Sequence, residues 1–202
     1  MIASLDGQKF NMKDKMVLLE GVEATFNHWV YPNLASYPKV SLSTDKDAQI
    51  RSFVKKVIEK KRQEGGQYFK DPKSLAKRYL TGWGGECAVE QHIGKLFVDF
   101  SVGNSNDYYV PDLRSAGYEV GVKTVNMGDF PLLRKPTPSS SNTPQIIVIR
   151  ESRYEFYICG LATYDVVNDP NNFSQLLVRS GGVLEVGVKS AFYRFDLLSP
   201  PL

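Results

Sequence analysis

The spacing of apolar residues changes from helical to strand-like near residue 96, and this change limits the possible folds more than any other feature. Before it, apolar residues recur at helical intervals over 43–64 and 84–96. After it, short apolar segments are separated by turn-forming residues, a pattern typical of strands. We therefore expect an α/β (α+β) domain with a central mixed β-sheet flanked by helices.

The expected helices and strands follow from these periods. The first helix begins near Ser43, where Thr44 and Asp47 can form a capping box, and ends at Gly65 and Gly66. A short helix is expected over 72–79 and another from Gly84 to Leu96. Beyond them we expect strands at 97–103, 108–113, 118–125, 145–150, 154–162 and 191–197, and a helix at 172–179.

The length of 202 residues suits one domain. We expect residues 1–80 to be a helical, basic N-terminal extension, and 84–200 to be a catalytic core. The Pro- and Ser-rich stretch 135–144 predicts a mobile surface loop inside that core.

Positive charge is concentrated in one segment. Residues 39–80 contain 12 Lys and Arg against 5 Asp and Glu, a net charge of +7, whereas the rest of the chain has a net charge of −4. A basic segment of this kind suits contact with a polyanion, although a solvated helix face has the same composition. The candidate contacts to DNA are Lys55, Lys56, Lys60, Lys61, Lys73, Lys77, Arg78, Arg134 and Lys135.

Several classes of function are disfavoured. The two cysteines form no CxxC motif, and His28 and His92 lack metal-ligand spacing, so a zinc site is not expected. No Gly-rich phosphate loop is present, which argues against a nucleotide cofactor. No segment has the length and apolarity of a membrane span or a signal peptide, and we expect a cytoplasmic protein.

One group of residues suits hydrolysis of a phosphodiester. That reaction needs a divalent ion held by carboxylates, and a lysine that orients water or neutralises developing charge. Asp112 follows a proline and precedes Lys123 by eleven residues, which predicts a hairpin with the two side chains on neighbouring strands. Upstream, Glu86 and Glu90 share one helix face, and either one can reach the same ion.

These residues resemble the PD-(D/E)XK nuclease superfamily, which includes restriction enzymes, junction resolvases and phage endonucleases. The similar segments are Gly85-Glu86, Pro111-Asp112 and Val122-Lys123-Thr124, within residues 84–163. The resemblance implies a restriction-endonuclease-like core. It also implies Mg²⁺ or Mn²⁺ bound by Asp112, a helical Glu and the backbone carbonyl of Val122, with Lys123 serving the attacking water.

The chain departs from this motif at Gly121, where the family has Asp or Glu two residues before the lysine. Glu119 lies on the same strand face in the predicted register and is one candidate replacement; Glu86 and Glu90 are others. An impaired site is the remaining alternative. The pentapeptide EVGVK recurs at 185–189 without an upstream Pro-Asp, so it has little diagnostic value by itself.

Each candidate also has a simple structural interpretation. Asp112 can start a turn, Glu86 can favour a helix N-terminus, and Glu119 can lie on a solvated strand. Lys123 lies in an apolar strand, where a lysine normally faces solvent or a carboxylate.

Together these features predict a metal-dependent endonuclease that cuts double-stranded DNA, of the restriction, homing or junction-cleaving type. Cutting two strands predicts a homodimer or another symmetric assembly. The resemblance to phage enzymes places such a protein in the host-cell cytoplasm if the chain is phage-encoded. The alternative is a catalytically impaired nuclease fold that binds DNA.

Overall fold

The computed structural model describes most of the chain. The described residues are 4–5, 8–9, 15–19, 22–26, 30–63, 72–101, 111–134, 136–180 and 183–202. No helix among them has the length and apolar character needed to cross a lipid bilayer.

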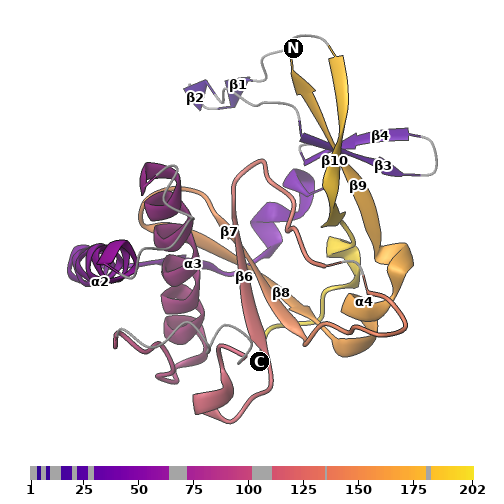
Figure 1. Ribbon diagram of the computed structural model, residues 1–202. Helices are drawn as coiled ribbons and strands as arrows, with labels where there is room; N and C mark the ends of the chain where they lie inside the picture. Colours follow the sequence, from indigo (N-terminus) through magenta and orange to yellow (C-terminus); the bar gives the residue numbers. More distant parts are fainter. Residues whose placement is uncertain are drawn as a thin grey trace.

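A four-stranded mixed sheet forms the centre of the molecule (Figure 1). Its order is β5 (Lys39–Ser41), β8 (Glu155–Ala162), β7 (Gln145–Arg150) and β6 (Gly121–Asn126). The pair β6–β7 is parallel, and the other pairs are antiparallel. The helices α2 (Thr44–Gln63) and α3 (Pro72–Ile93) lie on one side of this sheet. The predicted α/β class with a mixed sheet is confirmed.

The central strand β7 contributes to two hydrophobic cores. Ile146 and Val148 pack on the side of α2 and α3, and Ile147 and Ile149 pack on the opposite side. All four side chains are fully buried, which explains why the segment is apolar throughout instead of alternating. The opposite side is covered by η1 (Tyr31–Ser36), α4 (Tyr164–Asn168) and η5 (Phe195–Leu197).

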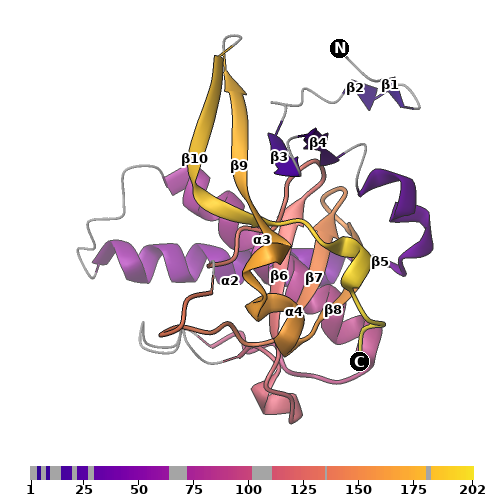
Figure 2. The same ribbon diagram turned by 90° about the vertical axis from the view of Figure 1, so that its right-hand side faces the viewer.

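A second four-stranded sheet extends away from the first (Figure 2). Its order is β10 (Val183–Phe192), β9 (Phe173–Ser180), β3 (Lys15–Leu19) and β4 (Val22–Thr25). The predicted helix at 172–179 is therefore wrong, and the predicted strand at 191–197 lies mostly beyond β10. Pairing of β9 with the distant strand β3 and with its hairpin partner β10 outweighs the local preference for a helix.

The first eighty residues are not simply a helical extension. β3 and β4 belong to the second sheet, and β5 is an edge strand of the central sheet. A short pair, β1 (Ser4–Leu5) with β2 (Gln8–Lys9), precedes them. The N-terminal region thus contributes strands to both four-stranded sheets. The predicted division between an extension at 1–80 and a core at 84–200 therefore does not describe the fold.

Helix α2 has the predicted extent but a different N-terminal cap. Ser43 Oγ accepts the backbone N–H of Lys46 at 3.1 Å. The carboxylate of Asp47 instead accepts from Arg51 at 2.7 Å and from Arg153 Nε at 2.9 Å. The capping box of Thr44 and Asp47 is therefore wrong, because this carboxylate joins α2 to the β7–β8 turn.

Helix α3 is one continuous helix where two were predicted. Gly84 and Gly85 are in its interior, because the helix packs very closely on the sheet there. A Cβ atom on Gly84 would lie 2.7 Å from the Phe156 ring, and one on Gly85 would lie 1.8 Å from Thr124 Oγ1. These glycines are therefore required by tertiary contact. The helix ends before Gly94, whose φ of 68° is left-handed.

Two of the three strands predicted after α3 are absent from the parts of them that the structure describes. Residues 97–101 have no strand pairing, and 111–113 form a turn that leads into η3 (Arg114–Ala116). The remaining parts, 102–103 and 108–110, lie outside the described residues. The third predicted strand starts at Gly121, three residues later than expected.

The predicted loop 135–144 is fastened where it rejoins the sheet. The backbone N–H of Asn142 donates to Asn168 Oδ1 at 2.7 Å, and the Asn168 amide donates back to the Asn142 carbonyl at 2.9 Å. This reciprocal pair fixes the chain at Asn142, three residues before β7 begins.

Substituting Gly85 with Ala tests the close packing of α3 on β6. The new methyl group overlaps Thr124, so we expect the free energy of unfolding to fall by about 1–3 kcal/mol in urea titrations. Gly82→Ala is the matched control, because nothing lies within 4 Å of its Cβ position. That control should raise stability by up to about 1 kcal/mol through helix propensity. Equal effects of the two substitutions would contradict this packing.

Candidate metal and active site

Three of the predicted site residues meet at the open edge of β6. Glu86 directly follows Gly85, where α3 lies very close to β6, and its carboxyl group interacts with the charge of Asp112. Asp112 reaches the same edge from the turn before η3. The charge of Asp112 adds to the effect of burial, which raises the pKa of Glu86, and the charge of Lys123 opposes the burial that raises the pKa of Asp112. Asp112 is thus the electrostatic neighbour of both other residues.

Asp112 is held by the backbone of the edge strand. Its Oδ2 accepts the N–H of Val122 at 2.6 Å. The preceding N–H, of Gly121, donates in the opposite direction to the Pro144 carbonyl beside β7. Because the N–H and C=O of one residue in an extended strand point the same way, the Val122 carbonyl also faces the Asp112 side. The predicted hairpin between Asp112 and Lys123 is wrong, but these two residues are neighbours in the structure.

The two carboxyl groups both resist ionisation. Burial, followed by the nearby charge of Asp112, raises the pKa of Glu86 to about 8. Burial also raises the pKa of the Asp112 carboxyl, against the opposing effects of the Val122 N–H and Lys123. Part of Asp112 is exposed to solvent, but its carboxylate is turned inward to the strand. A cation between these groups would relieve both desolvation and mutual repulsion.

Lys123 and Glu86 approach the edge from different sides of the sheet. Val125 belongs to the core opposite the helices, and strand side chains alternate, so Lys123 starts on that side. Thr124 contacts α3 on the helix side. Since β6 is an edge strand, a long lysine side chain and a helical glutamate can both reach Asp112 there.

Glu90 has a structural role. It is buried, and its Oε2 accepts the N–H groups of Phe97 and Val98 at 3.0 and 2.9 Å. Lys46 Nζ lies 3.6 Å from the other carboxylate oxygen. These contacts explain why residues 97 and 98 form no strand, and they occupy Glu90 as a cap for the chain leaving α3. The structure thus separates Glu90 from Glu86, which it resembles in sequence.

Glu119 is paired with Arg114. It precedes β6, and its carboxylate forms an exposed ion pair with Arg114 at 2.8 Å. The predicted shared face of residues 119, 121 and 123 does not exist, because the strand begins at 121. The role of Glu119 as the replacement for the acid missing at Gly121 stays a prediction.

The oxygen atoms at this edge suit a hard divalent cation. Two carboxylates and one backbone carbonyl are the donor types that Mg²⁺ and Mn²⁺ prefer. No group of three or more His, Cys, Asp or Glu side chains that could hold a metal ion occurs in the described part of the chain. A complete site would therefore need Val122 or another neutral oxygen beside Glu86 and Asp112.

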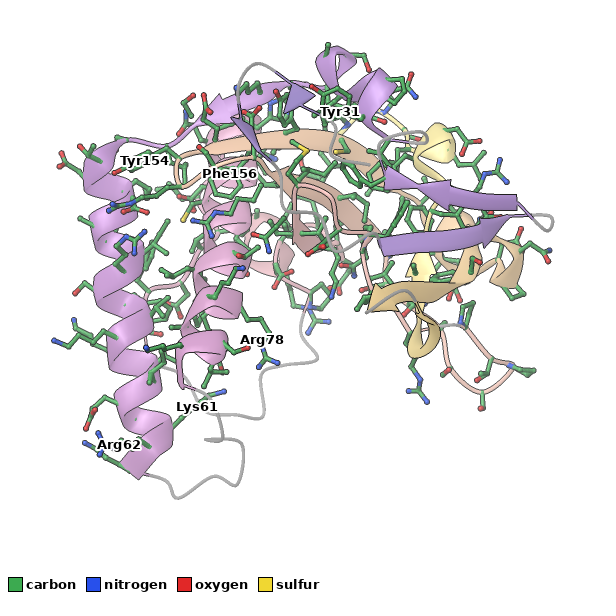
Figure 3. All side chains as sticks on the ribbon, turned by 90° about the horizontal axis from the view of Figure 1, so that it is seen from above. Tyr31, Lys61, Arg62, Arg78, Tyr154 and Phe156 are labelled. Carbon is green, nitrogen blue, oxygen red and sulfur yellow. The ribbon has the colours of Figure 1, made fainter. Side chains whose placement is uncertain are left out.

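The predicted DNA contacts lie mainly on the two helices. The exposed members are Lys55, Lys56, Lys73, Lys77, Arg78 and Arg134. Lys60 is half-buried, and Lys61 donates to the Tyr79 hydroxyl at 2.6 Å, which joins α2 to α3. Figure 3 shows Lys61, Arg62 and Arg78 near the C-terminal end of α2 and the N-terminal half of α3. Lys135 lies outside the described residues.

Comparison with known proteins finds no matching family model, curated protein or solved structure.

The pH dependence of stability tests the burial of Glu86. The pKa of Glu86 is about 8 in the folded state and 4.5 ordinarily, so the folded state is favoured when this carboxyl group is protonated. Its contribution to the free energy of unfolding is complete below pH 4.5 and is lost as the pH rises to about 8. We expect the loss to be at most about 1.4 kcal/mol per pH unit in metal-free urea titrations. Glu86→Gln should flatten this dependence, whereas Glu59→Gln on the exposed face of α2 should not. An unchanged pH profile in Glu86→Gln would contradict the buried carboxyl.

Substitutions of Glu90 test its structural role. Glu90→Ala leaves the N–H groups of Phe97 and Val98 without an acceptor, so we expect the free energy of unfolding to fall by about 2–4 kcal/mol. Glu90→Gln retains one acceptor oxygen and should lose less. Calorimetric titration of folded Glu90→Gln with Mn²⁺ should give wild-type affinity. A folded variant that loses Mn²⁺ binding would instead show that Glu90 is a ligand.

Proposed function

We propose that this protein is a Mg²⁺-dependent DNA endonuclease with a restriction-endonuclease-like core. The observation that carries the proposal is the position of Asp112, which lies beside Glu86 on one side and Lys123 on the other. Two carboxylates and a lysine at one strand edge suit metal-assisted phosphodiester hydrolysis, and they occur in the order that the resemblance implies.

The residues have distinct roles in this proposal. Glu86, Asp112 and the Val122 carbonyl hold the divalent ion, which supplies charge stabilisation for the phosphate when bound. Lys123 orients the attacking water or neutralises charge that develops on the phosphate. Asp112 also accepts a hydrogen bond from the Val122 N–H, so the same side chain binds the ion and covers the edge of β6.

Basic side chains on α2 and α3 are suited to hold the DNA backbone. Arg78 is eight residues before Glu86 on the same helix, which corresponds to about 12 Å along its axis. Contacts by Lys77, Arg78 and the exposed lysines of α2 would fall within one turn of a duplex centred near the site. Such contacts provide affinity and salt dependence without reading sequence.

Cleavage of both strands requires two sites, so we propose a symmetric pair of chains as the active form. Gly121 favours a second candidate function, a nuclease fold that binds DNA without cutting it, because this position lacks the expected carboxylate.

Incubation of supercoiled plasmid and branched DNA with Mg²⁺ separates these functions. The wild type should cut, and Asp112→Asn and Lys123→Ala should each slow cutting by at least about 100-fold. Linear plasmid as an early product indicates paired sites, and nicked circles indicate single ones. Asp165→Asn, an exposed aspartate on α4, is the matched control and should cut normally.

Two results would change the assignment. Wild-type cutting by Lys123→Ala would show that the site is wrong. Absence of cutting by every variant, with intact salt-dependent DNA binding, would favour the binding function.

A further inference from the structure

The space at Gly121, where the nuclease motif has a carboxylate, is filled from the neighbouring strand. The parallel register of β6 and β7 pairs Gly121 with Gln145. A Cβ atom on Gly121 would lie 2.7 Å from Gln145 Nε2 and 2.8 Å from its Oε1. The amide of Gln145 therefore lies over the glycine, in the volume that a side chain at position 121 would enter.

Hydrogen bonds fix which way this amide faces. Nε2 of Gln145 donates to the Thr143 carbonyl at 3.2 Å and to Thr143 Oγ1 at 3.1 Å. A backbone carbonyl can only accept, so the NH₂ group must be the end that faces Thr143. Oε1 is then the end that remains to accept from a donor or to bind a cation.

The alternation of side chains along β6 and β7 places the Gln145 side chain on the same side of the sheet as that of Lys123. Paired residues of parallel strands face the same way, and Ile147, two residues after Gln145, is opposite Lys123. A carboxylate at position 121 would extend from this same side. The spacing between positions 121 and 123 is about 6.6 Å along the strand.

We infer that Gln145 replaces the missing motif carboxylate and that its Oε1 is a neutral oxygen ligand for the divalent ion held by Asp112. This inference rests on the proposed function and names a residue for which the sequence predicts no role. The only signal in the sequence is the glycine itself, which implies a replacement but does not identify it.

The charge of the site explains why an amide is suitable there. Glu86 and Asp112 already repel each other, and a third carboxylate would add to that repulsion before the ion binds. An amide oxygen completes the coordination without a further negative charge. The expected cost is weaker ion binding than three carboxylates would give.

Direct measurement of Mn²⁺ binding to the full chain tests this inference without relying on cleavage. Loss of the free-ion signal in electron paramagnetic resonance gives the affinity. Gln145→Ala should weaken binding at least about tenfold, and Gln145→Glu should strengthen it. Gln91→Ala is the matched control, because Gln91 is an exposed glutamine whose amide also donates to a backbone carbonyl, that of Ser41. The control should bind Mn²⁺ as the wild type does.

A double substitution tests whether the two positions share one space. Gly121→Asp with Gln145→Ala restores the motif carboxylate in the vacated volume, and it should recover at least wild-type affinity. The backbone at Gly121 is not left-handed, so an aspartate is compatible with it. Denaturation curves confirm that each variant is folded.

The outcomes distinguish this inference from the proposed function. Wild-type Mn²⁺ affinity in Gln145→Ala, together with lost binding in Asp112→Ala, would overturn the role of Gln145 and leave the metal site intact. No better binding in the double variant than in Gln145→Ala would overturn the shared position. Absence of Mn²⁺ binding by the wild type would overturn the metal site and the role of Gln145 together.

Discussion

The contact between Gly85 and Thr124 is the constraint on which the candidate site depends. A helix with any larger residue at 85 could not approach β6 to this distance. Glu86 is the next residue, and in this position it is only partly exposed and interacts with the charge of Asp112. Thr124 Oγ1 is buried there without a hydrogen-bond partner among the described residues, a cost of about 1–3 kcal/mol that the surrounding packing must offset.

β6 is an edge strand, so some of its backbone groups are available to the candidate site. An edge strand presents unpaired N–H and C=O groups, which proteins normally cover or pair. Here Asp112 accepts the Val122 N–H, and the carbonyl of the same residue faces the same side. Covering the edge and assembling an oxygen-rich site are therefore achieved by one side chain. Gln145 extends this arrangement from β7, because parallel pairing places its amide over Gly121.

Glu86 and Glu90 show how tertiary structure separates similar residues. They are one helical turn apart, and helical periodicity predicts the same face for both. In the fold, Glu90 caps the chain at Phe97 and Val98 and interacts with Lys46. Glu86 instead faces a second carboxylate. The difference depends on where the chain turns after α3, which the helical pattern does not specify.

The α/β class, the extent of α2 and the strand β7 follow from local periodicity and apolar runs, which the sequence contains. The sequence also indicates Asp112, Lys123 and Glu86 as a group, although for Asp112 through a hairpin that does not form. The continuity of α3, the strand β9 and the contact of Asp112 with Val122 from a turn depend on the tertiary structure. Each of these depends on contacts between segments distant in the chain, whose free energy exceeds the local preferences that a sequence pattern records.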